Sequence, residues 1–429
     1  MKLAVVGSGH VGLVTGTCFA EKGHKILCID NDKAKINSLK KGKLTFYEPG
    51  LADLLKSNIK KGRISFSTDI KEAVDNCEII FIAVGTPLGE DGSADLSYIE
   101  NVSYDIAKHL KNYRVIVEKS TVPVKTGERV KSLIKKYAPG KDFDIVSNPE
   151  FLQEGKAIET TLYPDRIVVG LETEKARQIM TKLYSSFKAP LIITDLASAE
   201  LIKHASNSFL AMKISYVNAL ARICELSGAN ISQVSYGIGL DKRIGLEFLK
   251  AGIGYGGYCL PKDVAAFAHI SEQLGFNFNL LKEIQKINLN QRDWFVKKVE
   301  KELWVVKGKK VGVWGLSFKA DTDDIRESPA ISICQKLAEK GAHIRVYDPQ
   351  VRKLKGEKIS NLKFCNTPYE AAKGVHCLVI TTDWSEFKHV DFKTIKKYML
   401  HPTIIDGRNM FEPSYIKKMG FTYLSVGRN

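Results

Sequence analysis

The sequence predicts an α/β protein in which two Rossmann-like doubly wound domains are joined by a central helical domain with one long helix. In the first half, short apolar runs alternate with helical patterns, as in βαβ units around a parallel sheet. From about residue 197 to 226 a helical pattern continues without a proline or a turn signal. Alternation resumes at Lys310. We therefore expect domains at residues 1–196, 197–305 and 306–429.

The expected strands are short apolar runs bounded by polar or glycine-containing segments. In the first domain they are Lys2–Val6, Lys25–Asp30, Glu78–Val84, Arg114–Glu118, Asp144–Val146, Arg166–Val169 and Leu191–Thr194, and in the last domain Val311–Leu316, His343–Tyr347, Cys377–Thr381 and Thr403–Ile405.

Charge and composition limit the classes of function. The chain of 429 residues has a formal net charge of +16, which raises the alternative of a nucleic-acid-binding protein. Its lysines lie in short scattered clusters, such as Lys40-Lys41 and Lys396-Lys397, and no nucleic-acid-binding motif is present, so we expect a generally basic surface without nucleic acid as a partner. No run of 18 apolar residues occurs, and none of the eight cysteines forms a Cys-x-x-Cys pair. We expect a cytoplasmic protein without membrane contact, disulfides or a metal site.

A glycine-rich turn between the first strand and helix predicts a dinucleotide site. Gly7 permits the tight turn, Gly9 lets a pyrophosphate approach the backbone, and Gly12 allows close packing of helix and strand. The helix dipole then faces the pyrophosphate. Asp30 ends the next strand and favours NAD over NADP, although Lys35 lies close enough to weaken that preference.

The segment from Gly252 to Asp263 predicts a nucleophilic cysteine. Its glycines expose backbone N–H groups, which suit an anion or a developing oxyanion. Pro261 is expected to open a helix that ends near Leu274, so that Cys259 precedes a helix N-terminus and has Lys262 nearby. Both features favour the thiolate. The alternative is a small buried cysteine in a turn. A nucleophilic cysteine beside a nicotinamide site indicates aldehyde oxidation through a thioester.

Other residues could complete this site. Lys203 and Asn207 are four residues apart on the long helix and share one face, where they could stabilise an alkoxide or form an ordinary solvated surface. Thr121 and the stretch from Asn148 to Glu154 follow expected strand ends, where open α/β sheets bind ligands.

Together these stretches resemble the UDP-glucose/GDP-mannose 6-dehydrogenase family over nearly the whole chain. The resemblance rests on the glycine turn with Asp30, Tyr47-Glu-Pro-Gly-Leu51, Gly85-Thr-Pro87, Lys119-Ser-Thr-Val-Pro123, Asn148-Pro-Glu-Phe-Leu152, Lys203-x-x-x-Asn207, Phe248-Leu-Lys-Ala251, the cysteine loop, Gly315-Leu-Ser-Phe-Lys319, Asp321–Ser328 and Asp406-Gly-Arg408.

The resemblance implies roles for these residues. It implies that Cys259 is the thioester nucleophile, that Lys203, Asn207 and Asp263 stabilise the alkoxide and the hemithioacetal oxyanion, and that Glu154 and Thr121 serve thioester hydrolysis. It implies NAD contacts from Gly7, Gly9, Gly12, Asp30, Lys35, Gly85, Thr86, Thr121, Glu154, Lys262 and Arg326. The sugar nucleotide would contact Glu150, Phe151, Leu152, Lys203, Asn207, Phe248, Leu249, Lys250, Ala251, Gly252, Gly256, Lys319 and Arg408, and Arg243 from a neighbouring subunit.

The activity that this resemblance implies is NAD-dependent four-electron oxidation of UDP-glucose to UDP-glucuronate by a homodimer or higher homo-oligomer. The central helices would form the dimer. The same chemistry on a UDP-N-acetylhexosamine or GDP-mannose is the alternative within the family, and a two-electron hydroxy-acid dehydrogenase is the alternative outside it. One residue departs from the family pattern, because Tyr258 stands where most relatives carry serine. The departure bears on which hexose fits the pocket.

Overall fold

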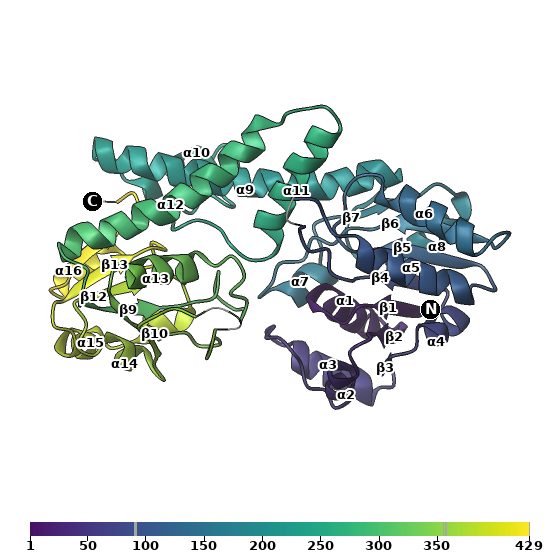
Figure 1. Ribbon diagram of the computed structural model, residues 1–429, viewed down its shortest axis with the longest axis horizontal. Coiled ribbons are helices and arrows are strands. Elements are labelled where there is room, and N and C mark those ends of the chain that lie inside the picture. Colours follow the sequence, from purple (N-terminus) through teal and green to yellow (C-terminus); the bar gives the residue numbers. More distant parts are fainter. Residues whose placement is uncertain (90–91, 355, 357, 429) are drawn as a thin grey trace. The chain divides into compact units, whose positions relative to one another are not determined.

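The computed structural model describes residues 1–89, 92–354, 356 and 358–428, which fold into two compact units. Unit 1 holds Met1–Ser206 together with His269–Phe276, and unit 2 holds Asn207–Ala268 and the chain from Asn277 onward. Two of the boundaries fall inside the helices α9 (Leu196–Ser227) and α11 (Cys259–Gln273), and the third lies just after the end of α11. Figure 1 labels most of the elements of each unit.

Unit 1 contains an eight-stranded sheet in the order β3-β2-β1-β4-β5-β6-β7-β8. All neighbouring strands are parallel except β6 and β7, which pair antiparallel. The strands are β1 (Lys2–Val6), β2 (Lys25–Ile29), β3 (Ile64–Ser67), β4 (Ile79–Ile82), β5 (Arg114–Glu118), β6 (Phe143–Ser147), β7 (Ile167–Gly170) and β8 (Leu191–Thr194).

Helices cover both faces of this sheet, so its central strands are apolar at consecutive positions (Figure 1). In β1, Leu3 and Val5 belong to one buried cluster, and Ala4 and Val6 belong to another. The helices of unit 1 are α1 (His10–Glu21), α2 (Lys33–Lys40), α3 (Leu51–Lys60), α4 (Ile70–Asn76), α5 (Ser97–His109), α6 (Thr126–Tyr137), α7 (Ala157–Leu162) and α8 (Glu174–Tyr184).

Unit 2 contains a six-stranded parallel sheet in the order β11-β10-β9-β12-β13-β14. Both sheets therefore share the order of a Rossmann fold, in which the strand order reverses beside the first strand. The strands are β9 (Lys310–Trp314), β10 (His343–Tyr347), β11 (Leu362–Phe364), β12 (Cys377–Ile380), β13 (Thr403–Asp406) and β14 (Thr422–Ser425). The other elements of this unit include α10 (Ile231–Gly239), α12 (Asn279–Leu303), α13 (Pro329–Glu339), α14 (Pro368–Ala372), the 3₁₀ helix η1 (Ser385–His389), α15 (Phe392–Tyr398) and α16 (Pro413–Lys418).

The fold class predicted from the sequence is confirmed, including a long central helix of 32 residues. Three edge strands were not predicted, namely β3, β11 and β14, because each is short and carries polar or charged residues. The sheet of unit 1 is mixed rather than wholly parallel, because an alternating pattern does not encode strand direction. The division into three domains at residues 1–196, 197–305 and 306–429 stays a prediction.

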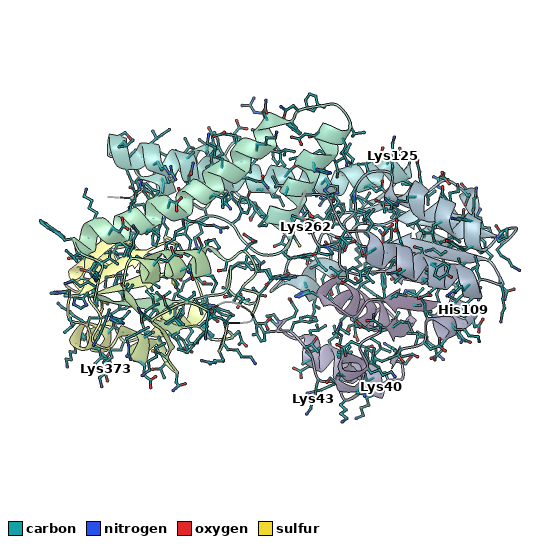
Figure 2. All side chains as sticks on the ribbon, viewed as in Figure 1. Lys40, Lys43, His109, Lys125, Lys262 and Lys373 are labelled. Carbon is teal, nitrogen blue, oxygen red and sulfur yellow. The ribbon has the colours of Figure 1, made fainter. Side chains whose placement is uncertain are left out.

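The surface and the hydropathy of the helices complete this description. Lysine side chains occur in both units; Lys40 and Lys43 lie at the end of α2 and just after it, and Lys373 follows α14 (Figure 2). Within the residues that the structure describes, no helix combines the length and the apolar character needed to cross a bilayer.

Candidate functional site

The glycine turn after β1 has the geometry of a dinucleotide-binding loop. Gly7 has φ +100°, and a Cβ there would lie 2.5 Å from the carbonyl oxygen of Ala83. A Cβ on Gly12 would lie 1.9 Å from the carbonyl oxygen of Gly7, so both positions require glycine. At Gly9, which precedes α1, a Cβ would meet no atom within 4 Å. The turn therefore leaves open space at the helix N-terminus, where a pyrophosphate would meet backbone N–H groups and the helix dipole.

Asp30 lies beside this turn at the end of β2. Its Oδ2 accepts a hydrogen bond from the Ser8 backbone N–H at 2.8 Å, and Lys35 Nζ lies 2.9 Å from the same oxygen. The carboxylate repels a ribose phosphate, and the ammonium of Lys35 weakens that repulsion. The residues present therefore fit NAD. The acid that disfavours NADP is Asp30, and it is paired with Lys35.

We expect the protein to use NAD with a kcat/KM at least about tenfold above that for NADP, which corresponds to about 1.4 kcal/mol. Asp30→Ser should narrow the ratio, because the carboxylate that disfavours the extra phosphate is gone. Lys35→Ala should widen it and serves as the opposite-charge control. Steady-state rates with both cofactors measure the ratio, and equal rates for the unmodified protein would refute this expectation.

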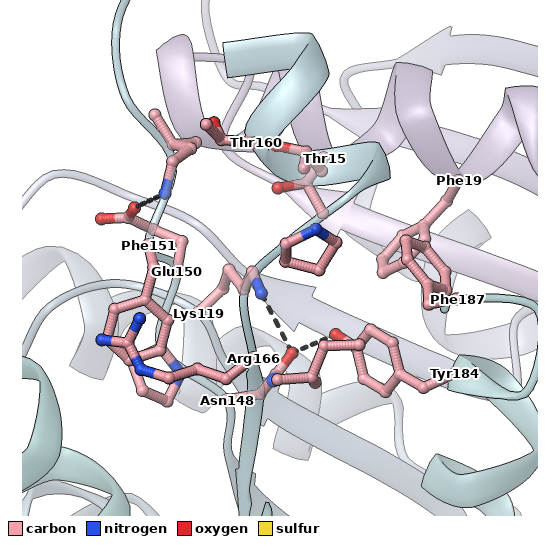
Figure 3. A pocket seen from close by; sticks show the side chains of 15 residues that line it. Thr15, Phe19, Lys119, Asn148, Glu150, Phe151, Thr160, Arg166, Tyr184 and Phe187 are labelled. Carbon is pink, nitrogen blue, oxygen red and sulfur yellow. Dashed lines mark hydrogen bonds between the residues drawn. The ribbon is translucent and has the colours of Figure 1, made fainter. Parts of the chain in front are cut away.

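Polar side chains gather where β5 and β6 end, around a small cavity of about 50 Å³ (Figure 3). Lys119 Nζ donates to Asn148 Oδ1 at 3.1 Å, and the Tyr184 hydroxyl donates to the same oxygen. Lys203 Nζ, on α9, lies 3.0 Å from Glu150 Oε1. Burial lowers the pKa of Lys119 to about 8, with Glu150 opposing the shift and Lys203 adding to it. The predicted residues Glu150 and Lys203 are thus paired directly.

The neighbouring loops bring other predicted residues of unit 1 to this edge of the sheet. Thr86 Oγ1 donates to the carbonyl oxygen of Thr121 at 2.9 Å, which ties together the loops after β4 and β5. Gly85 lies in the exposed loop after β4. The Glu150 carboxylate also accepts the Leu152 N–H at 2.9 Å, and the Phe151 ring packs under Arg166, with 3.9 Å from guanidinium carbon to ring centroid. Glu154 lies in the loop between β6 and α7.

Two buried acids lie behind these loops. Both carboxylate oxygens of Glu118, the last residue of β5, are buried without a hydrogen-bond partner among the described residues. Burial, together with the nearby Glu200, raises the pKa of Glu118 to about 8. Burial also raises the pKa of Glu200 to about 7, although Glu200 accepts the N–H groups of Lys125 and Gly127.

The raised pKa of Glu118 predicts a stability that falls with pH. The folded chain holds the proton more tightly than the unfolded chain, so the stabilisation is full below about pH 4.5 and is lost as the pH rises through about 8. Glu118→Gln should remove a slope of up to about 1.4 kcal/mol per pH unit in this window. Urea unfolding at several pH values measures it. The exposed Glu128→Gln is the control, and identical profiles for wild type and Glu118→Gln would contradict the assignment.

Unit 2 places Cys259 as the first residue of α11. The helix was predicted to start at Pro261, but it begins two residues earlier, at Cys259. Pro261 can lie in the first turn because a proline there costs no helical hydrogen bond. Asp263 lies one turn further along, on the same face as Cys259. Its buried carboxylate accepts Asn207 Nδ2 at 2.6 Å, and Lys262 Nζ lies 2.6 Å from its other oxygen. Cys259 is partly exposed. The structure therefore brings three of the predicted residues together, because the Asp263 carboxylate binds both Asn207 and Lys262.

The glycine loop before Cys259 is fixed by close contacts of its backbone. Gly254 and Gly257 have φ of +101° and +82°. A Cβ on Gly256 would lie 2.3 Å from the carbonyl oxygen of Glu327. The Gly252 N–H donates to Asn218 Oδ1 at 2.8 Å, so the loop is held at this end as well. Its shape is therefore set by the fold and not by the glycines alone.

Three polar side chains on α12 and the predicted Arg408 provide the remaining anchors. Asn288 accepts the Tyr255 N–H at 2.8 Å, Gln291 donates to the carbonyl oxygen of Gly252 at 2.8 Å, and Arg292 donates to that of Tyr255 at 3.3 Å. Arg408 is partly buried and donates to the carbonyl oxygens of Gly254, Phe318 and Thr381. Arg408 thus binds the backbone beside the cysteine loop.

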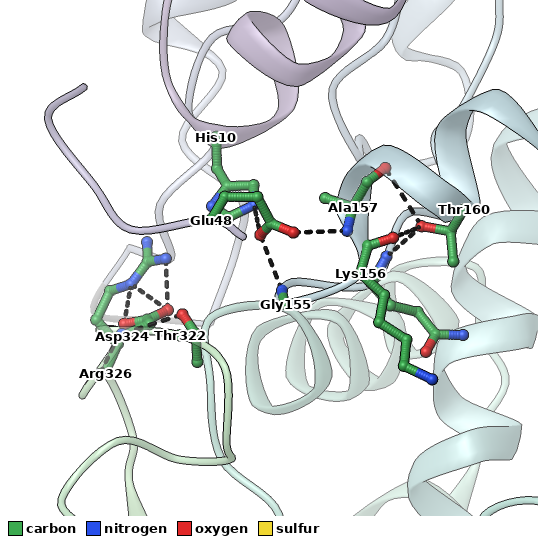
Figure 4. A network of polar contacts seen from close by, with 10 residues as sticks. His10, Glu48, Gly155, Lys156, Ala157, Thr160, Thr322, Asp324 and Arg326 are labelled. Carbon is green, nitrogen blue, oxygen red and sulfur yellow. Dashed lines mark hydrogen bonds and ion pairs between the residues drawn. The ribbon is translucent and has the colours of Figure 1, made fainter. Parts of the chain in front are cut away.

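Tyr258, the departure from the family pattern, packs against Arg326. The guanidinium carbon of Arg326 lies 4.4 Å from the centroid of the Tyr258 ring. Asp324 accepts from the same guanidinium through both carboxylate oxygens, at 2.9 and 2.7 Å (Figure 4). Lys262 Nζ lies 5.5 Å from the ring centroid. The phenol therefore contacts two of the predicted cofactor-binding cations of this unit.

The remaining predicted residues of unit 2 lie on and around the segment that precedes the glycine loop. Phe248 has φ +63°, and Leu249 and Ala251 are buried in the core of the unit. Lys250 is exposed and pairs with Asp383 at 2.8 Å. Arg243 is exposed and binds Asp241 through a two-point contact. Lys319 follows Phe318 in the loop after β9.

Several residues in these networks were not predicted from the sequence. They are His10, Glu48, Tyr184, Asn218, Asn288, Gln291 and Arg292. Asn288, Gln291 and Arg292 are buried at a spacing of three and four residues on α12, so polar side chains on an otherwise apolar helix face were the available signal. The others contact residues far away in the chain and leave no local pattern.

Three models of one family match the chain along most of its length. They are described as the NAD binding, central and UDP binding domains of the UDP-glucose/GDP-mannose dehydrogenase family, and they match residues 1–188, 197–290 and 312–413. The chain is 45% identical to UDP-glucose 6-dehydrogenase TuaD of Bacillus subtilis, over 100% of this chain and 93% of that protein.

Solved structures agree with these matches. A UDP-glucose dehydrogenase from Pyrobaculum islandicum superposes with a TM-score of 0.91 at 35% identity and covers 99% of this chain and 96% of its own. A UDP-D-ManNAc dehydrogenase from Pyrococcus horikoshii gives a TM-score of 0.88 at 28% identity and covers 100% of this chain and 99% of its own. The alternatives of a two-electron hydroxy-acid dehydrogenase and a nucleic-acid-binding protein gain no support from these matches.

Proposed function

Because the chain belongs to the UDP-glucose/GDP-mannose dehydrogenase family, we propose that it oxidises UDP-glucose to UDP-glucuronate with two molecules of NAD. The observation that carries the proposal is Cys259 in the first turn of α11, on one face with a buried carboxylate that holds Asn207 and Lys262. The relative at 45% identity is a UDP-glucose 6-dehydrogenase. The chain is less similar to the solved UDP-D-ManNAc dehydrogenase, to which it is 28% identical. This difference in sequence identity favours glucose over an N-acetylhexosamine as the sugar.

The overall reaction balances as UDP-glucose, two NAD⁺ and water giving UDP-glucuronate, two NADH and three protons. NAD, when bound, accepts the hydride of each oxidation. The first oxidation converts the C6 alcohol to an aldehyde. The Cys259 thiolate then adds to the aldehyde carbon and forms a hemithioacetal, whose oxidation leaves a thioester. Water adds to the acyl carbon, the C–S bond breaks, and the thiolate returns as the acid leaves.

The chain's own residues suit these steps. Asn207 and the Lys262–Asp263 pair form a polar, buried group one turn from Cys259, where they support an oxyanion next to the sulfur. Lys203 is held by Glu150 and supports removal of the hydroxyl proton in the first oxidation. Glu154 and Thr121 handle the proton and the water of the last step. Phe248–Gly252, Gly256, Lys319 and Arg408 bind the sugar nucleotide, and Arg326 and Lys262 contact NAD.

We also place the protein in the cytoplasm as a homodimer formed by the central helices. The reducing compartment suits eight cysteines that form no disulfide in the described chain. The exposed apolar residues Phe209, Tyr216 and Ile223 on α9 would be covered by a second copy. Arg243, which is exposed, would then reach the neighbouring subunit's site.

Purified protein with excess NAD and limiting UDP-glucose should form two NADH per UDP-glucose consumed. Absorbance at the NADH band gives the ratio, and chromatography identifies UDP-glucuronate as the product. A ratio of one would show that the reaction stops at the aldehyde. Turnover only with UDP-N-acetylmannosamine or GDP-mannose would replace the proposed substrate, and Tyr258→Ser would then test whether the phenol sets the preference.

Cys259→Ser should lose acid production by at least about a hundredfold while NAD and UDP-glucose still bind, because serine keeps the size but not the nucleophilicity of the thiolate. Product assays and calorimetric binding measure the two properties separately. Cys224→Ser, at a buried cysteine of the same unit, is the matched control and should keep turnover. Undiminished acid production by Cys259→Ser would disprove the thioester.

A further inference from the structure

One buried carboxylate, Glu48, connects three separate segments of unit 1 (Figure 4). Its Oε1 accepts the Ala157 N–H at 2.7 Å, and its Oε2 accepts the Gly155 N–H at 2.8 Å. His10 Nε2 lies 3.0 Å from Oε2. Only 3% of Glu48 is exposed, so these contacts replace water completely. Glu48 thus joins the first residue of α1, in the dinucleotide turn, to the segment that carries Glu154.

The segment from Gln153 to Thr160 forms a closed loop around Glu154. The Gln153 N–H donates to Thr160 Oγ1 at 3.1 Å, and the Lys156 N–H donates to the carbonyl oxygen of Gln153 at 2.9 Å. Gly155 has φ +81°, so the backbone turns sharply directly after Glu154. The backbone on each side of Glu154 is therefore fixed, on one side by Thr160 and on the other by Glu48.

The opposite end of the connection is equally well defined. The His10 ring stacks on Phe46, with centroids 4.5 Å apart and an interplanar angle of 24°. Phe46 and Glu48 belong to the same segment between α2 and α3. This segment therefore holds His10 in two ways, by stacking of the Phe46 ring and by the Glu48 carboxylate. Because His10 directly follows Gly9, these two contacts act at the turn where a pyrophosphate would bind.

We propose that Glu48 is a positioning residue for Glu154, which it holds at a fixed place relative to the dinucleotide turn. The inference rests on the proposed function, in which Glu154 handles the proton of thioester hydrolysis. Only a glutamate fits both N–H groups at once. Glutamine offers one oxygen and turns an NH₂ group towards the second N–H, and aspartate is one methylene shorter and cannot reach both. Loss of the contact frees the backbone at Gly155 and lets Glu154 move from its place.

The test measures the covalent intermediate in full-length Glu48→Gln during turnover with UDP-glucose and NAD. Slower hydrolysis should let the acyl group accumulate on Cys259, visible as added mass in rapidly quenched intact-protein mass spectrometry. We expect kcat to fall about tenfold or more, since a small displacement of a catalytic group has an effect of this size or larger. Affinity for NAD should fall by a smaller factor than kcat, because His10 remains stacked on Phe46 beside the dinucleotide turn.

Asp144→Asn is the matched control. Asp144 is a carboxylate of unit 1 that accepts hydrogen bonds from Tyr113 and Thr173 at the start of β6, the opposite end from the Asn148–Glu154 segment. It should lower the thermal midpoint without accumulation of the acyl-enzyme. Equal acyl-enzyme levels in Glu48→Gln, Asp144→Asn and wild type would overturn the inference. If Glu48→Gln does not fold, Glu48→Asp carries the same expectation, because it keeps the charge but not the reach.

Two further samples separate this inference from the function on which it rests. If the wild-type protein forms no UDP-glucuronate, the proposed function is wrong, and the inference about Glu48 is wrong as well. If the wild type forms the acid but Glu154→Gln hydrolyses the thioester normally, the role of Glu154 is wrong and Glu48 has nothing to position. Accumulation in both Glu154→Gln and Glu48→Gln, with wild type and Asp144→Asn clear, supports Glu48 specifically.

Discussion

Buried carboxylates that accept backbone N–H groups are the interactions on which the ligand-facing loops of both units depend. A loop that follows a parallel strand has N–H groups that no neighbouring strand can satisfy, and burial without a partner would cost free energy. Asp30 satisfies Ser8, Glu48 satisfies Gly155 and Ala157, and Glu200 satisfies Lys125 and Gly127. Where the carboxylate is ionised, such a bond is charge-assisted and therefore stronger than a neutral one. The same carboxylates that complete the fold thus fix loops that carry predicted site residues.

Unit 2 repeats this construction with a different outcome. Gly315 follows β9 with φ +95° and donates to the carbonyl oxygen of Tyr347, as Gly7 donates to that of Ile29. Asp348 follows β10 as Asp30 follows β2. However, Asp348 accepts the N–H groups of Leu316 and Ser317 and is 1% exposed. Its oxygens accept four backbone N–H groups, from Leu316, Ser317, Gln350 and Val351, whereas those of Asp30 accept two, from Ser8 and Asp32, beside an open turn. The second sheet keeps the Rossmann shape, and its acid is not available to a ribose hydroxyl.

The sequence was informative wherever a single residue type is required by its local backbone. Gly7, Gly12 and Gly256 are examples, because a Cβ at each would lie within 2.5 Å of a carbonyl oxygen. Cys259 could also be singled out from the sequence, because a glycine loop that leads into a helix is a local pattern. Glu48 lies in the Tyr47–Leu51 stretch of the resemblance, but its structural role could not be predicted, because its N–H donors lie 107 and 109 residues away.

The contacts of Tyr258 show how a residue that departs from the family pattern is accommodated directly before Cys259. The phenol lies immediately before the nucleophile, yet its ring is occupied by Arg326, which Asp324 also holds. A serine at this position could not offer a ring face to the guanidinium. The ring therefore gives Arg326, a predicted NAD-binding residue, a second contact beside Asp324, and Asn207, Lys262 and Asp263 keep their own contacts. Substitution at this position is expected to change how firmly Arg326 is held before it changes the reaction at the sulfur.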